Sequence, residues 1–303
     1  MEIGFEQVDV FTDRAFAGNP LCVVPDGRGL DPGQMQDIAR EMNLSETTFV
    51  LPPTAPGADY WMRIFTPAQE IPFAGHPSVG TAFLLALRGR LPLREPVTRV
   101  HQQVGVGVLP LDIEVAGGKP GRVVMTQGTP AFGGVLRDLE PVAEALGIGA
   151  ALLSSRLPIQ PVSTGLFHLM VPLPDLAALA ALRPNTGALD RLLAGAGALG
   201  CYAFTLETGT AEVTARARMF APAAGVPEDP ATGSAVGPLG AYLAAHGALA
   251  RGCRSLVVDQ GIEMGRPSRM FVELERDAAG MPTGVRVGGT TVPVITGTIH
   301  LER

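Results

Sequence analysis

The chain carries one sequence pattern twice, and this repeat constrains the fold more than any other feature. The first copy runs from RIFTPA to GHPSVGTA (residues 63–82), and the second from RMFAPA to EDPATGSA (residues 218–235). Aligned by eye, residues 63–72 match 218–227 and, after a gap, residues 76–82 match 229–235. His76 then falls opposite Asp229, each directly before a proline that suits the first turn of a helix. The repeat predicts two related halves that supply different polar groups to one composite site.

The length of 303 residues agrees with two domains of ordinary size. Each would be large enough to bury its own core. The glycine-rich segment 116–121 and the turn at 278–284 are the candidate seams. We therefore expect an N-terminal half-barrel domain, formed by residues 1–118 plus 288–303, and a C-terminal half-barrel domain, formed by residues 119–287. The active site is expected in the cleft between them.

Composition argues against several classes of partner. The net charge of −6 and the pI near 5.4 provide no basic surface for nucleic acid. The first six residues include two acids and lack the basic start and apolar core of a signal peptide. The longest apolar stretches, 71–87 and 235–250, fall short of the ~20 apolar residues of a membrane span. We expect a cytoplasmic protein that binds neither nucleic acid nor a membrane.

The sequence contains no convincing motif for a metal or a nucleotide site. Cys22, Cys201 and Cys253 form no CxxC pair, so they are interpreted as plain buried thiols. The five histidines show no HxxxH or HExxH spacing, and no metal site is expected. A formal GxGxxG at 195–200 follows a helix-like segment and precedes a strand-like one, the reverse of the order that a dinucleotide site requires. It is interpreted as a loop, and no cofactor is expected.

Strand patterns dominate the chain. They cover residues 7–11, 47–51, 60–65, 104–115, 122–126, 165–171, 202–206, 212–220, 255–258, 270–274 and 291–301. Amphipathic surface helices are expected at 32–42, 139–146, 176–182 and 189–193. Segments 77–87 and 234–245 are apolar on nearly all sides, which is typical of an enclosed helix. The expected fold is α+β, with two similar pseudo-symmetric domains in which a strongly curved β-sheet or barrel wraps a central helix.

Both central helices begin in a segment rich in Gly, Ser and Thr. The free N–H groups of such a helix start favour an anion. The helix dipole contributes only ~0.3–1 kcal/mol at exposed positions, so a carboxylate would also need several N–H contacts and hydroxyl groups. Thr81, Thr232 and Ser234 are placed to supply hydroxyls. The alternative is that the small residues only allow each helix to pack tightly.

Three titratable residues accompany these helices. His76 lies between Gly75 and Pro77, and Glu46 lies in a short polar segment where a helix gives way to a strand. A partly desolvated carboxylate at such a position can exchange protons with a carbon acid. Each residue also has an alternative reading: a structural histidine, a solvated loop glutamate and, for Asp229, a helix cap.

The motifs together resemble those of the PhzF (phenazine biosynthesis-like) family, within the diaminopimelate epimerase-like superfamily. The resemblance covers the whole chain. It is carried by VDVFT (8–12), FAGNPL (16–21), NLSET (43–47), RIFTP (63–67), GHP with GTA (75–82) and EDPATGSA (228–235). It implies two similar domains with the active site in the cleft between them, and a cofactor-independent isomerase that is usually a homodimer.

The resemblance also implies roles for individual residues. Glu46 matches the general acid/base, which removes a proton from carbon and returns it elsewhere on the substrate. His76, Asp229 and Ser234 match residues that surround the substrate and assist proton transfer. The expected substrate contacts are Ser45, Gly75, Gly233, Asn19, Thr81 and Thr232.

The implied reaction is the isomerisation of trans-2,3-dihydro-3-hydroxyanthranilate, or of a related unsaturated or cyclic amino acid. An amino-acid epimerase or racemase is the first alternative. The wider superfamily's epimerases use a cysteine pair at the two helix starts, where this chain has His76 and Asp229. A non-catalytic protein that kept the fold to bind carboxylates or protein partners is the second alternative.

Overall fold

The computed structural model describes residues 1–153, 156–250 and 252–301. The chain forms two compact units, Met1–Met125 with Gly288–Arg303, and Thr126–Val287. The boundary falls after residue 125 rather than after residue 118, because the glycine-rich segment is the turn of a hairpin inside the first unit. No helix in the described ranges is long and apolar enough to span a membrane.

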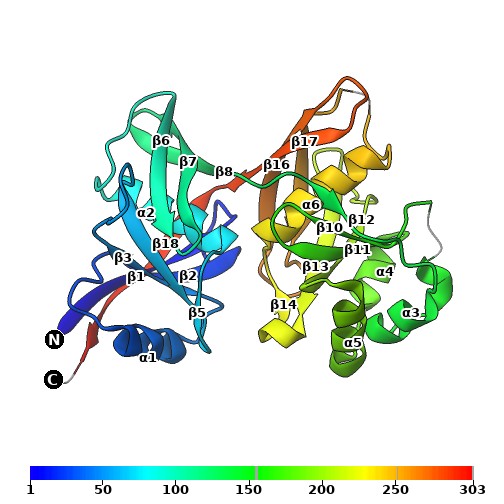
Figure 1. The fold of residues 1–303 in the computed structure, drawn as a ribbon, viewed down its shortest axis with the longest axis horizontal. Helices are drawn as coiled ribbons and strands as arrows, with labels where there is room; N and C mark the ends of the chain where they lie inside the picture. The colour runs from blue at the N-terminus through cyan, green and yellow to red at the C-terminus, as the bar shows by residue number, and fades with distance from the viewer. Residues whose placement is uncertain (154–155, 251, 302–303) are drawn as a thin grey trace. The chain divides into compact units, whose positions relative to one another are not determined.

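The first unit is a curved sheet around one helix. Its elements are β1 (Glu2–Val10), β2 (Asn19–Val24), α1 (Pro32–Met42), β3 (Thr47–Leu51), β4 (Tyr60–Phe65), β5 (Glu70–Ile71), α2 (Gly75–Leu87), β6 (Val97–Val104), β7 (Gly107–Ala116), β8 (Lys119–Thr126) and β18 (Thr291–His300). β1 pairs antiparallel with β18 and β2, β2 parallel with β3, β3 antiparallel with β4, and β4 parallel with β6. α2 contacts β1, β2, β3, β7 and β18 (Figure 1), so the strands surround it on several sides.

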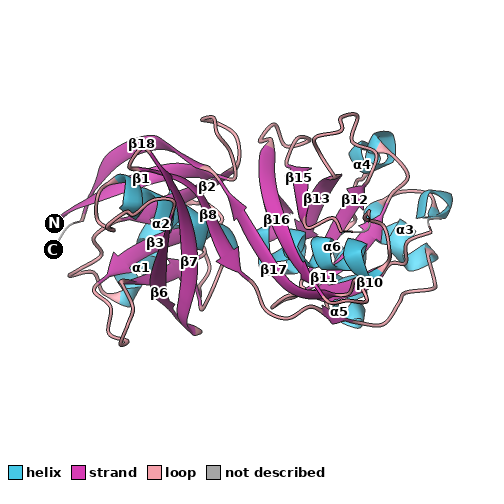
Figure 2. Ribbon diagram, turned by 90° about the horizontal axis from the view of Figure 1, so that it is seen from above, coloured by secondary structure: helices cyan, strands magenta, loops and turns pink. Residues whose placement is uncertain are grey.

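The second unit repeats this plan. Its elements are β9 (Ala131–Phe132), α3 (Glu140–Leu146), η1 (Ala150–Leu153), β10 (Gln160–Ser163), β11 (Phe167–Pro172), α4 (Leu176–Ala181), α5 (Thr186–Ala196), β12 (Gly200–Thr205), β13 (Ala215–Ala221), η2 (Pro222–Ala224), β14 (Val226–Asp229), α6 (Gly233–Ala245), β15 (Ser255–Gln260), β16 (Ser268–Arg276) and β17 (Pro282–Gly289). β10 pairs antiparallel with β11, β11 parallel with β12, β12 antiparallel with β13, and β13 parallel with β15. α6 contacts β10, β11 and β16 (Figure 2). The succession of pairings from β1 to β6 thus recurs from β10 to β15.

Both central helices are enclosed, as their sequences predict. Every residue of α2 from Gly75 to Ala86 is buried, and so is most of α6. At Gly80 an added Cβ would lie 2.6 Å from Val10 Cγ2 and 2.8 Å from Leu21 Cδ2. Glycine therefore lets α2 approach the sheet, and burial of its apolar sides gives the helix most of its stability.

An arginine–glutamate pair marks the repeat in each unit. Arg63 on β4 bonds Glu70 on β5, and Arg218 on β13 bonds Glu228 on β14. The partners are seven residues apart in the first pair and ten in the second. The extra residues lie in the second hairpin, which holds the short helix η2.

This insertion corrects the alignment made from the sequence. After the hairpins the helices α2 and α6 match residue for residue. Each has 13 residues and is followed by a glycine with φ +67° one position after its C-cap. His76 therefore corresponds to Ser234, the second residue of its helix, and not to Asp229. Asp229 corresponds to Ile71 at the end of the short strand.

Most predicted elements are present, but several strands were missed. α1 has the predicted bounds, and Asp31 and Gln34 form a capping box at its start. The single strand expected at 104–115 is instead part of a hairpin, with β6 and β7 joined at residues 105–106. Strands β2, β10 and β17 were not predicted, because prolines, glycines or polar residues interrupt their apolar patterns. The short strands β5, β9 and β14 were not predicted either.

Two glycines in the loop after β15 differ in how closely other backbone atoms pack against them. Gly261 and Gly265 have φ values of +77° and +70°. A Cβ at Gly261 would collide with the backbone oxygens of Pro230 and Arg266, whereas one at Gly265 would meet open space. We expect Gly265→Ala to lower the free energy of unfolding by ~1–2 kcal/mol, the cost of left-handed alanine, and Gly261→Ala to cost a further ~1–3 kcal/mol of steric strain. Denaturant titration measures both, and equal losses would contradict the steric argument.

Candidate functional site

Glu46 and His76 come together in the first unit. α1 ends at Met42, Asn43 takes the left-handed conformation as its C-cap, and Glu46 directly precedes β3. His76 is the second residue of α2. The Glu46 Oε2 to His76 Nε2 distance is 3.4 Å, and the two side chains are 16% and 7% exposed. The sequence-predicted acid/base and its expected neighbour are therefore adjacent and largely shielded from water.

The imidazole of His76 is neutral at physiological pH. Burial lowers the pKa of His76 to about 3. The contact with Glu46 is thus not an ion pair near pH 7. His76 Nε2 forms no hydrogen bond within the described residues. Catalytic hydrogen bonds are often long before a substrate binds, so this nitrogen is suited to complete its bonding with a ligand.

Of the other predicted site residues in this unit, Gly75 and Ser45 lie next to His76 and Glu46, whereas Thr81 lies in the core. Gly75 opens α2, and the N-cap before it, Ala74, provides no side-chain cap, so the first turn keeps its N–H groups uncapped by a side chain. Ser45 precedes Glu46, and Asn19 is a fully buried residue at the start of β2. Thr81 lies deeper in α2, is fully buried, and its hydroxyl is 2.9 Å from that of Thr48. The expected placement of Thr81 at the helix start is wrong, because it belongs to the core.

Asp229 ends β14 in the second unit, and α6 begins at Gly233. The N-cap of α6 is Thr232, so the reading of Asp229 as the cap is wrong. Instead, the Thr232 hydroxyl donates a hydrogen bond of 2.5 Å to Asp229 Oδ2. The hydroxyl expected to contact substrate is thus directed at the Asp229 carboxylate.

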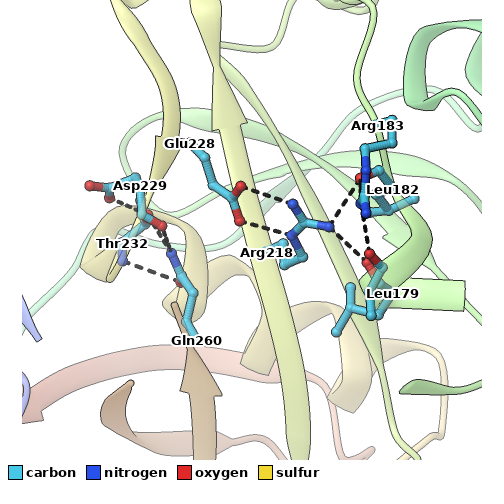
Figure 3. Close-up of polar contacts among 9 residues, drawn as sticks. Leu179, Leu182, Arg183, Arg218, Glu228, Asp229, Thr232 and Gln260 are labelled. Carbon is cyan, nitrogen blue, oxygen red and sulfur yellow. Dashed lines mark hydrogen bonds and ion pairs between the residues drawn. The ribbon is translucent and has the colours of Figure 1, made fainter. Parts of the chain in front are cut away.

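Two sets of buried contacts hold this segment (Figure 3). Arg218 is 6% exposed, pairs with Glu228 beside Asp229, and donates to the carbonyl oxygens of Leu179 and Leu182. Gln260 bonds both Asp229 and Thr232. These contacts hold the end of strand β14, with Arg218 bound to Glu228 and Gln260 bound to Asp229.

Ser234 contacts a residue that sequence reasoning missed. Its Oγ lies 3.2 Å from Nε2 of His168, a fully buried residue of β11. Burial lowers the pKa of His168 to about 4, so this imidazole is also neutral near pH 7. A single histidine in an apolar strand carries no sequence signal for such a role. The preceding residue, Gly233, has its carbonyl oxygen bonded by the amide of Gln127.

The three cysteines lie outside both central helices. Cys22 is on β2 and Cys201 on β12, and burial raises the pKa of each thiol to about 12. Both are plain buried thiols, as predicted, whereas Cys253 is partly exposed. The residues at the second position of α2 and α6 are His76 and Ser234. Neither helix therefore begins with a thiol.

Comparison with known proteins supports the same relationship as the motifs. The sequence model of the phenazine biosynthesis-like protein family matches residues 8–297. The trans-2,3-dihydro-3-hydroxyanthranilate isomerase of Pseudomonas fluorescens is 41% identical over 294 residues, covering 97% of this chain and 98% of the relative.

Solved structures agree with this relationship. The crystal structure of the Bacillus anthracis phenazine biosynthesis protein of the PhzF family aligns with a TM-score of 0.90 at 30% identity, covering 99% of this chain and 100% of the other. A hydroxyproline epimerase from Agrobacterium vitis aligns with a TM-score of 0.64 at 15% identity, covering 98% and 92% of the two chains, and this shows a shared fold. The chain therefore belongs to the phenazine biosynthesis-like (PhzF) family and is an isomerase of the PhzF type.

Proposed function

We propose that the protein moves a proton between two carbon atoms of a small carboxylate substrate, with Glu46 as the general acid/base. The observation that carries this proposal is the largely buried Glu46 carboxylate beside the neutral His76. The substrate class is trans-2,3-dihydro-3-hydroxyanthranilate or a related unsaturated or cyclic amino acid. The relative from Pseudomonas fluorescens bears the name of that reaction, which supports the choice.

In the proposed mechanism Glu46 removes a proton from a carbon next to an unsaturated system. The electron pair of the broken C–H bond delocalises over that system, so an anion develops. N–H groups at the starts of α2 and α6 stabilise this charge. The protonated Glu46 then returns its proton to another carbon, and the carboxylate is regenerated. The proton and electron count is balanced within the substrate and Glu46.

We propose that the residues of both units act on the same substrate molecule. His76 hydrogen-bonds the substrate beside the proton that moves, while Asp229 and Ser234 assist from the second unit. Ser45, Gly75 and Gly233 contact the substrate through backbone or side-chain groups next to these residues. The family resemblance also implies a cytoplasmic homodimer, and light scattering of the purified protein tests its dimeric state.

The epimerase alternative has less support. Two-base racemisation needs a second acid/base on the opposite face of the carbon. The likeness to the hydroxyproline epimerase is one of fold alone. Neither α2 nor α6 begins with a cysteine, the residue that the resemblance implies at both helix starts of the superfamily's epimerases.

Hydrogen exchange tests the proposal directly. The protein is incubated in D₂O with dihydro-hydroxyanthranilate and a panel of small unsaturated or cyclic amino acids, and mass spectrometry measures deuterium uptake. We expect carbon-bound deuterium together with a shifted double bond in at least one substrate. Binding without exchange across the panel would favour the non-catalytic alternative. Exchange with inversion at one carbon would favour the epimerase.

A further inference from the structure

Gln260 occupies a central position in the buried network around Asp229 (Figure 3). It is the last residue of β15 and is 1% exposed. Its Nε2 lies 2.7 Å from the Asp229 carbonyl oxygen and 3.1 Å from Thr232 Oγ1. Its Oε1 lies 2.9 Å from the Tyr202 hydroxyl and 3.3 Å from the Thr232 backbone nitrogen. All four contacts are made by one side-chain amide.

These contacts fix which end of the amide is which. A flipped amide would bring its oxygen against the Asp229 carbonyl, two acceptors at hydrogen-bond distance, and its NH₂ against the Thr232 N–H. The Gln260 nitrogen must therefore donate to Asp229 O and Thr232 Oγ1. Tyr202 stays a neutral donor, because burial, with a smaller effect of the Asp229 charge, raises its pKa well above the usual value.

The orientation of Gln260 then sets the direction of the next bond. Because an amide N–H points at Thr232 Oγ1, the hydroxyl cannot donate back to that nitrogen. Its proton is directed instead at Asp229 Oδ2, at 2.5 Å. This oxygen of Asp229 is consequently the acceptor of the bond. The series of donors runs one way, from the amide through the hydroxyl to the carboxylate.

We propose that Gln260 is a positioning residue for the reaction, acting through the Thr232 hydroxyl to hold Asp229 in one rotamer, with Oδ2 as the acceptor of that hydroxyl. This inference rests on the proposed role of Asp229 in proton transfer. Gln260 itself has no need to contact the substrate. Preorganised groups of this kind matter because a small displacement of a catalytic group is costly in rate.

The first unit provides a comparable buried glutamine as a control. Gln102 on β6 is also fully buried, accepts from the hydroxyl of Tyr60 at 3.4 Å, and donates to Ser78 Oγ at 2.9 Å. It is thus a second buried Gln–Tyr pair in the same protein, with none of the predicted catalytic carboxylates among these partners. Gln260→Leu and Gln102→Leu each remove a buried amide of similar size, and thermal melting of both shows whether they fold.

The first measurement needs no substrate. NMR of the labelled protein follows the exchange of the Thr232 hydroxyl proton with water, which is slow when the proton is held in a buried hydrogen bond. We expect a protected proton in the wild type and in Gln102→Leu, and its loss in Gln260→Leu. A proton that stays equally protected in Gln260→Leu would overturn the proposal.

The second measurement is kinetic, on the substrate found by hydrogen exchange. We expect Gln260→Leu and Thr232→Val each to lower kcat by roughly 10- to 100-fold, as for loss of a hydrogen bond to a charged group. KM should change less, Thr232→Ser should restore most of the rate, and Gln102→Leu should keep kcat near the wild-type value.

The double variant of Gln260→Leu and Thr232→Val should be little worse than either single variant, because both substitutions act on the same bond. Additive losses, or equal kcat losses in Gln260→Leu and Gln102→Leu, would refute the role. If the wild type turns over no substrate, the proposed function fails and the hydroxyl measurement alone decides whether the network exists.

Discussion

Replacing Glu46 by Gln is expected to lower kcat by about 10²–10⁴-fold, the usual contribution of general acid/base catalysis. Glutamine keeps the size of the side chain but cannot carry the proton from one carbon to the other. His76 is a poor replacement, because burial lowers its pKa to about 3 and makes its imidazole a weak base. Steady-state rates and deuterium uptake with the substrate found by hydrogen exchange measure the loss.

The matched control is Glu70→Gln in the same unit. Glu70 pairs with Arg63 at the surface of the β4–β5 hairpin and is not among the proposed catalytic residues. We expect this variant to keep kcat, with a small change in melting temperature, because Glu70 is 42% exposed and glutamine can still accept a hydrogen bond from Arg63. Wild-type turnover in Glu46→Gln, or an equal loss in both variants, would remove Glu46 from its assigned role.

The fold could be predicted largely from features that are local in sequence. Asp31, Pro32 and Gln34 mark the start of an amphipathic helix through contacts within a few residues of the sequence. Helix α1 accordingly has the expected bounds. The two all-round apolar segments required an enclosing sheet, and the structure shows this for α2 and α6. The missed strands include β2, β10 and β17. Their sequences alone, such as the glycine-rich β17, do not favour a strand.

The candidate site residues that the sequence predicts lie in short motifs. Glu46, His76 and Asp229 all lie in such motifs, and the structure brings the first two together. His168 and Gln260 were not predictable, because each reaches its partner across the sheet from a strand distant in sequence. The alignment of the two repeats by eye was also wrong, because it matched His76 with Asp229 instead of Ser234. The extra residues in the second hairpin leave its arginine–glutamate pair intact and change the register of the residues after them.

The free energy of unfolding is expected to fall steeply as the pH is lowered below about 6.5, the usual pKa of histidine in an unfolded chain. Burial lowers the pKa of His76 to about 3 and that of His168 to about 4. Between these values and 6.5 the unfolded state binds a proton at each histidine and the folded state does not. The stability held by the neutral imidazoles is therefore fully present above pH 6.5 and decreases on acidification, by about 1.4 kcal/mol per pH unit for each histidine.

Denaturant titrations between pH 4.5 and 7.5 measure this slope, with His76→Gln, His168→Gln and the control His300→Gln. The two buried variants should each lose the contribution of one histidine, whereas His300→Gln should follow the wild type because its side chain is 74% exposed. The single tryptophan, Trp61, lies on β4, so its fluorescence reports unfolding of the first unit, which contains His76. Far-ultraviolet circular dichroism reports both units. A common pH slope for all four proteins would show that the two histidines are accessible to protons in the folded state, and would remove the neutral imidazoles from the proposed mechanism.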